Sequence, residues 1–188
     1  LVRGYAQSDD AGSSWKLADG TKPDLPVLPS AGAFFETSDQ PLKVSNIVCD
    51  SKHRPWVCLK TAESSCGLVV HHYDGTRWRS FDPASRLNRR EMKLNGGFGT
   101  ITIDTHDRLY LVGLRGSPVR GGVRGEVVLL CSDDHGERFQ SLPLFPPDST
   151  LPHAGVTLER PTGHNRVDTP LVLFSTGNKG ASNQDLDQ

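Results

Sequence analysis

The stretch Ser8-Asp9-Asp10-Ala11-Gly12-Ser13-Ser14-Trp15 decides the fold class of this chain. It reads S-x-D-x-G-x-x-W, which is the chemistry of a tight turn between two strands. Glycine adopts positive φ without steric cost, and Asp and Ser side chains hydrogen-bond to the amides of a turn. The aromatic residue then packs where the next strand begins. The stretch therefore predicts a hairpin corner near the start of the chain.

Related segments recur further along the sequence. The corner returns in full as Ser132-Asp133-Asp134-His135-Gly136-Glu137-Arg138-Phe139, and in a shorter form without the Ser as Tyr73-Asp74-Gly75-Thr76-Arg77-Trp78. Residues 47–57 align with residues 101–111 at a shift of 54, and both read strand, D-x-x-x-R turn, strand. Gly75 and Gly136 are 61 residues apart, and Trp15 precedes Trp78 by 63. Similarity at such a period, with four strands in each repeat, indicates the blades of a β-propeller.

The repeats predict an all-β domain organised as about three blades. Strands 1–7 and 14–17 are expected to close one blade (1–18), and two complete blades follow at 44–82 and 98–145. The first two strands of a further blade are expected at 154–176, before a polar tail at 177–188. A closed propeller has roughly four to eight blades. The sequence also starts at Leu1, inside a strand, so we expect a fragment that is completed by the remainder of the propeller or by an associated copy.

Composition narrows the class of protein. The chain has 188 residues with 13 Pro and 19 Gly, most of them between short apolar runs, which favours short strands. The best helical window, 85–94, is short and charged, and no run approaches the roughly 18 apolar residues of a membrane span. The net charge of −1 gives no general attraction to nucleic acid. No metal or cofactor motif is present, and we read Cys49, Cys58 and Cys131 as buried thiols, with a Cys49–Cys58 disulfide as the alternative.

The run 5–20, followed by Leu25-Pro26-Val27, resembles the BNR-repeat (Asp-box), neuraminidase-like family. Residues 72–78 and the segment from Asp104 to Tyr110 are similar to its following blades. The resemblance implies a secreted or periplasmic, carbohydrate-directed propeller, in a family whose members include sialidase-like proteins and polysaccharide lyases such as ulvan lyases. It also implies that the main catalytic residues lie upstream of this segment, because none of them matches a position here.

A propeller places the corners described above on one rim and the other connections on the opposite rim. Two of those other connections, 82–97 and 114–124, are rich in cations. Arginine binds carboxylate or sulfate through two parallel hydrogen bonds, so these loops predict a binding surface for an acidic polysaccharide. The alternative is a pair of solvated loops, and nucleic acid is disfavoured because aromatic residues are not interleaved. The candidate substrate-binding residues are Arg86, Arg89, Arg90, Arg115, Arg120 and Arg124.

Catalysis has one weak candidate, His153, which precedes an inner strand and could act as a base beside Arg115 or Arg120. The function predicted from sequence is therefore that of scaffold and groove wall in a polysaccharide lyase or sialidase-like hydrolase. The alternative is a non-catalytic propeller that binds glycan or protein.

Overall fold

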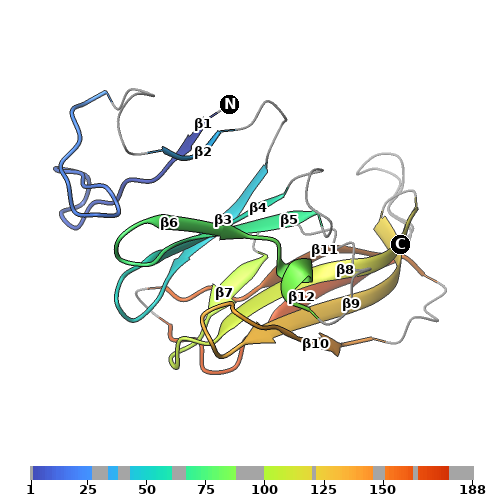
Figure 1. Cartoon of the computed structure of the whole chain (residues 1–188). Helices are drawn as coiled ribbons and strands as arrows, with labels where there is room; N and C mark the ends of the chain where they lie inside the picture. Colours follow the sequence, from blue (N-terminus) through green and yellow to red (C-terminus); the bar gives the residue numbers. More distant parts are fainter. Residues whose placement is uncertain are drawn as a thin grey trace.

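The computed structural model describes residues 2–26, 34–37, 43–60, 67–87, 100–119, 122–145, 151–162 and 165–177. Within these residues the regular structure is almost entirely β, with one short 3₁₀ helix (Figure 1). No helix in the described part of the chain is long and apolar enough to cross a membrane. The elements are β1 (Val2–Gly4), β2 (Phe34–Thr37), β3 (Lys43–Cys49), β4 (Pro55–Lys60), β5 (Leu68–Tyr73), β6 (Trp78–Phe81), η1 (Pro83–Arg86), β7 (Ile101–Ile103), β8 (Leu109–Val119), β9 (Gly122–Ser132), β10 (Gln140–Pro143), β11 (His153–Leu158) and β12 (Val172–Thr176).

The strands form antiparallel sheets in chain order. The first sheet is β3-β4-β5-β6, and the second contains β7-β8-β9, with β10 paired to β9. The pair β11-β12 joins the second sheet only through the bridge His153↔Val123. The strands expected between 44 and 81 and between 99 and 142 are present with small shifts at their ends, so the all-β prediction is confirmed.

Two features differ from the sequence predictions. Residues 114–124 were expected to be a loop, but β8 continues to Val119 and pairs in register with β9, which begins at Gly122; residues 120–121 are outside the described residues. The glycines there permit a close approach: Gly116 pairs with Gly125, and a Cβ on either would lie 2.2 or 2.0 Å from the opposite backbone oxygen. At the N-terminus, β1 pairs with the unpredicted β2, and the expected strand 14–17 contributes only the bridge Gln7↔Lys16.

The D-x-x-x-R turns of the two sheets are built identically. Asp50 accepts hydrogen bonds at Oδ1 from the N–H groups of Lys52 and Arg54, each at 2.9 Å. Asp104 accepts the equivalent bonds from His106 and Arg108, also at 2.9 Å. The residue before each arginine has positive φ, 58° at His53 and 61° at Asp107. The sequence repeat is therefore also a repeat of backbone geometry.

The two S-x-D-x-G corners are also equivalent. Gly12 N–H donates to Ser8 Oγ at 2.7 Å, as Gly136 N–H donates to Ser132 Oγ at 2.8 Å. The Asp then holds the amide four residues beyond it, with 2.8 Å from Ser14 N to Asp10 Oδ1 and 2.8 Å from Arg138 N to Asp134 Oδ1. In the shorter corner the Asp holds the amide three residues beyond it, with 3.0 Å from Arg77 N to Asp74 Oδ1.

The sheets pack face to face. Successive side chains of a strand point to opposite faces, and both faces of β8 are buried between Leu109 and Leu114. Leu109 and Leu111 belong to an apolar cluster shared with the first sheet, whereas Val112 and Leu114 belong to a second cluster shared with β11 and β12. The first cluster also contains Trp56, which is 1% exposed. The second sheet is thus an inner layer of a stack.

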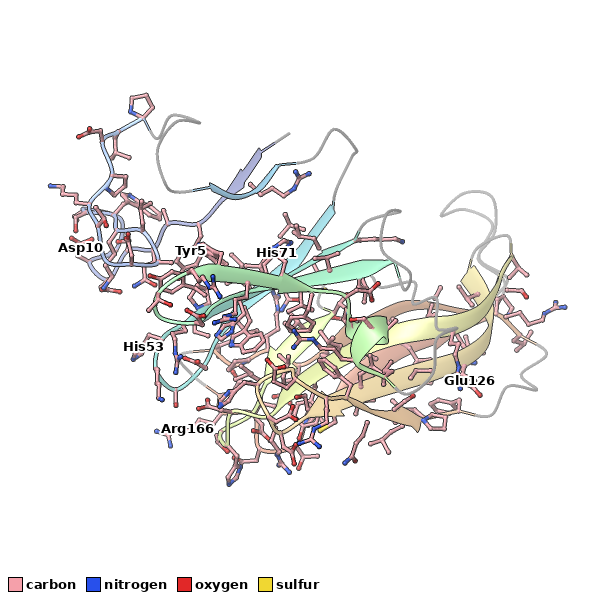
Figure 2. All side chains as sticks on the ribbon, viewed as in Figure 1. Tyr5, Asp10, His53, His71, Glu126 and Arg166 are labelled. Carbon is pink, nitrogen blue, oxygen red and sulfur yellow. The ribbon has the colours of Figure 1, made fainter. Side chains whose placement is uncertain are left out.

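Antiparallel order places the β3–β4, β5–β6, β7–β8 and β9–β10 turns at one end of the stack, called here the turn end. The β8–β9 connection lies at the opposite end, called the hairpin end. Figure 2 shows Asp10, His53 and Arg166 toward the turn end and Glu126 toward the hairpin end.

Candidate functional site: an arginine-lined groove

The arginines expected on one surface lie in different places. Arg89, Arg90 and Arg120 are outside the described residues. At the hairpin end, Arg124 is exposed, but the Arg115 guanidinium is paired with the Glu126 carboxylate. Sequence inspection missed this partner because the two residues are separated along the chain, and only the hairpin register places them opposite each other.

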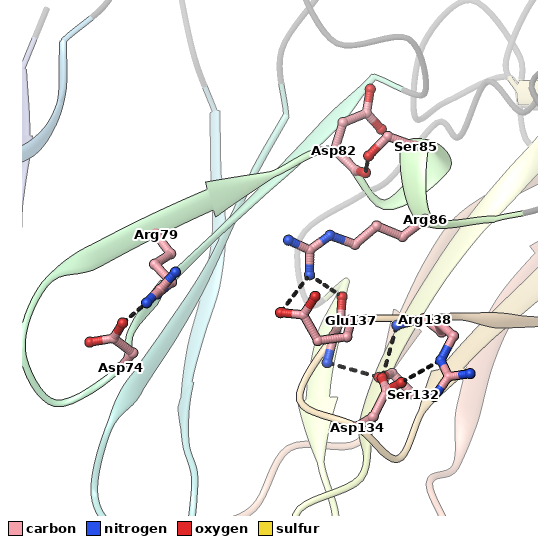
Figure 3. Close-up of polar contacts among 10 residues, drawn as sticks. Asp74, Arg79, Asp82, Ser85, Arg86, Ser132, Asp134, Glu137 and Arg138 are labelled. Atoms are coloured by element: carbon pink, nitrogen blue, oxygen red, sulfur yellow. Dashed lines mark hydrogen bonds and ion pairs between the residues drawn. The ribbon is translucent and has the colours of Figure 1, made fainter.

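Arg86 was expected on the rim away from the S-x-D-x-G corners, and this placement was wrong. Its guanidinium donates to the Gly136 carbonyl, lies 3.6 Å from a Glu137 carboxylate oxygen and stacks 4.0 Å from the Phe81 ring centroid (Figure 3). The cause is η1. Asp82 caps this helix through Ala84 N–H at 2.8 Å, and the helix turns the chain back across the corner of the second sheet.

A groove opens at the turn end beside this corner. Its volume is about 570 Å³, and it collects three arginines from three separate segments. Arg86 comes from η1, Arg108 from the β7–β8 turn and Arg138 from the β9–β10 corner. The groove is lined by Arg86, Arg108, Cys131, Asp133, Asp134, Arg138, Phe139 and Gln140, and it is called here the arginine groove.

Two of these arginines are anchored by their Nε atoms alone. Arg108 Nε donates to Asp104 Oδ2 at 2.6 Å, and Arg138 Nε donates to Asp134 Oδ2 at 3.0 Å. These are the only side-chain hydrogen bonds of the two guanidinium groups within the part of the chain that the structure describes. Their Nη groups therefore retain donors for a ligand. The Arg138 side chain is 88% exposed and the Arg108 side chain 43%.

The anchoring carboxylates stay ionised. Burial opposes ionisation of Asp134, but hydrogen bonds from the Arg138 N–H, the Ser132 hydroxyl and the Arg138 guanidinium outweigh it and lower its pKa. Burial likewise opposes ionisation of Asp104, and hydrogen bonds from Arg108, His106 and Tyr110 lower its pKa. Each arginine is thus held by a fixed negative charge at neutral pH.

Two titratable groups have raised pKa values here, one that lines the groove and one that is hydrogen-bonded to the carboxylate anchoring Arg108. Burial raises the pKa of the Cys131 thiol. Burial, and then the nearby Asp104 charge, raise the pKa of Tyr110 to about 12, and the Tyr110 hydroxyl donates to Asp104 at 3.1 Å. Both groups are protonated at neutral pH.

His153, the catalytic candidate, lies at the opposite end of the stack from this groove. Its ring is 3% exposed, and its Nδ1 lies 2.9 Å from Thr176 Oγ1. The rings of Phe145 and Phe174 lie against it, with centroids 6.1 and 5.6 Å away. No interaction in the described ranges joins it to Arg115. The prediction of a catalytic role is not tested by this geometry, which is that of a packed aromatic ring.

The cysteines differ in part from the sequence prediction. Cys58 is buried, whereas Cys49 is exposed, and both are free thiols, so the alternative disulfide is not formed. Across the residues described, no group of three His, Cys, Asp or Glu side chains is arranged to hold a metal ion. The chain matches no model of a known protein family and no curated protein sequence.

Proposed function

We propose that this chain is part of a β-propeller that binds an acidic polysaccharide through the arginine groove. The observation that carries the proposal is the groove itself, in which Arg108 and Arg138 are each fixed through Nε and keep their Nη donors for a carboxylate or sulfate. Asp133 and Gln140 add an acceptor and an amide for sugar hydroxyl groups.

The propeller part of the proposal rests on repetition. Successive antiparallel sheets stack face to face, and their turns share the same hydrogen bonds, as expected of units that each contact their neighbours. The resemblance to Asp-box proteins adds a secreted location and a carbohydrate ligand to the proposal. The described residues favour binding over chemistry, because the candidate base His153 is hydrogen-bonded and buried.

Titration calorimetry with alginate oligosaccharides, whose sugars carry carboxylates, tests the function. We expect binding that weakens with salt, whereas uncharged dextran does not bind. The Arg138→Ala variant should weaken alginate binding roughly tenfold, since a hydrogen bond to a charged group is lost. Lys60→Ala, which removes a cation at the end of β4 away from the groove, is the control and should bind normally. Equal affinity of wild type and Arg138→Ala would rule out the groove as the binding site.

The same incubation tests for chemistry. A polysaccharide lyase would generate unsaturated uronate ends, which absorb ultraviolet light. We expect binding without this product, and a steady rise in absorbance would replace the binding proposal by the lyase alternative.

A further inference from the structure

A second cavity lies at the same end of the molecule. It has a volume of about 210 Å³ and opens between residues 17–19 and the corner that joins β5 to β6. Three aromatic rings meet there: the Trp78 centroid lies 5.8 Å from that of Tyr5 and 5.8 Å from that of Tyr73. Tyr5 and Tyr73 are buried, and Asp19 and Arg77 are exposed at the edge. This cavity is called here the aromatic pocket.

The aromatic pocket occupies the position of the arginine groove one repeat earlier. Arg77-Trp78 and Arg138-Phe139 are 61 residues apart, and the N–H of each arginine donates to the Asp of its corner, three residues before Arg77 and four residues before Arg138. The opposite walls of the two cavities are also formed by equivalent segments. Arg86 follows the last strand of the first sheet, and residues 17–19 follow the bridge Gln7↔Lys16 of the N-terminal segment. The turn end therefore carries one cavity at each of two successive repeat junctions.

We propose that the aromatic pocket is a second saccharide subsite, which takes one sugar ring of the same glycan that the arginine groove binds. The identity of the glycan rests on the proposed function, whereas the pocket rests on its own side chains.

The side chains of the pocket match the two faces of a sugar ring. Aromatic surface packs against the C–H groups of a pyranose, and a few fixed polar groups orient its hydroxyls. Arg77 has a guanidinium without a hydrogen bond or ion pair in the described ranges. Asp19 uses Oδ1 to accept Thr21 N–H at 2.9 Å, and its other oxygen has no described contact. Arg77 thus offers donors, and Asp19 an acceptor, beside Tyr73 and Trp78.

The experiment uses the full chain and alginate oligosaccharides of increasing length. Tryptophan fluorescence is followed in a Trp15→Phe background, where the remaining indoles are Trp78 and the buried Trp56. We expect long oligosaccharides to change the fluorescence. We also expect Arg77→Ala to weaken their binding roughly tenfold, as loss of a hydrogen bond to a charged group does. Trp78→Phe keeps a ring in place and should weaken binding less; because it removes the fluorescent reporter, its affinity is measured by titration calorimetry. Lys60→Ala, which removes a cation at the end of β4, is the control in which affinity stays unchanged.

The variants separate this inference from the proposed function. If Arg138→Ala weakens binding but Arg77→Ala does not, the arginine groove binds alone and the second subsite is overturned. If Arg77→Ala weakens binding but Arg138→Ala does not, the aromatic pocket stands and the groove fails. If neither changes affinity, both are overturned.

Discussion

Ser51 and Asp107 join the turns of two neighbouring sheets. The Ser51 N–H donates to Asp107 Oδ1 at 2.8 Å, and the Ser51 hydroxyl donates to Oδ2 at 2.6 Å. The next pair of turns repeats the contact, because the Thr105 hydroxyl donates to Asp168 Oδ1 at 2.7 Å. One carboxylate per repeat therefore ties each turn to the one before it.

Removing this carboxylate should loosen the stack. Asp107→Ala deletes two hydrogen bonds to a charged acceptor, and we expect it to lower the free energy of unfolding by about 1 kcal/mol, since the site is exposed. Asp133→Ala removes an exposed carboxylate with no described partner and serves as the control. Urea denaturation measures both. If the two variants are equally stable, the contact between the turns contributes nothing.

The two S-x-D-x-G corners offer a matched pair of glycine substitutions. Gly12 and Gly136 have φ of 91° and 78°, so alanine is strained at both by about 1–2 kcal/mol. A Cβ on Gly12 meets no atom within 4 Å, whereas a Cβ on Gly136 would lie 2.8 Å from the Phe81 ring. We therefore expect Gly136→Ala to cost roughly 2 kcal/mol more than Gly12→Ala in thermal unfolding. Equal losses would show that the Phe81 contact relaxes freely.

Equivalent strand positions should differ in sensitivity according to their place in the stack. Val112 lies five residues after Asp107, and Leu173 lies five residues after Asp168. Val112 is fully buried, but Leu173 is 70% exposed, because β12 has no described sheet beyond it. We expect Val112→Ala to destabilise the chain by about 2 kcal/mol and Leu173→Ala by less than about 0.5 kcal/mol. Comparable losses in denaturant titrations of the two variants would mean that Leu173 is covered in solution.

Acid should destabilise the fold through His71 and His72. Burial, with Arg3 nearby, lowers the pKa of His71 from 6.5 to about 4, and burial lowers that of His72 to about 4. Between those values the unfolded chain binds protons that the folded chain does not. Stability is therefore fully present above pH 6.5 and is lost as the pH falls toward 4, by roughly 3 kcal/mol at most for each residue.

The His72→Phe variant removes the contribution of His72 to this pH dependence and leaves that of His71. Phenylalanine should keep the stacking on Trp56, whose ring centroid lies 3.6 Å from that of His72. Unfolding measured at pH 7 and at pH 5 should show a smaller loss in the variant than in the wild type. An unchanged pH dependence would assign the acid sensitivity to other groups.

The sequence alone determined most strands of the two large sheets and the S-x-D-x-G and D-x-x-x-R turns between them, because each of these depends on a few neighbouring residues. The local backbone conformation is set by three features of the sequence: glycine at a positive φ, an Asp that caps the amides following it, and alternating apolar residues. For that reason, the recurrence of Asp50 and Asp104, and of Ser8 and Ser132, corresponds to the same hydrogen bonds in the structure.

Only the tertiary structure decided which arginines meet. Arg86, Arg108 and Arg138 lie on separate segments, and their convergence depends on how η1 folds back and how the sheets stack. The pairing of Arg115 with Glu126 depends on the register of the β8–β9 hairpin. The glycines of this segment had suggested a loop. The conformation of a turn depends on hydrogen bonds among neighbouring residues. The groove between two repeats depends on how segments far apart in the sequence pack together, which no short stretch of sequence specifies.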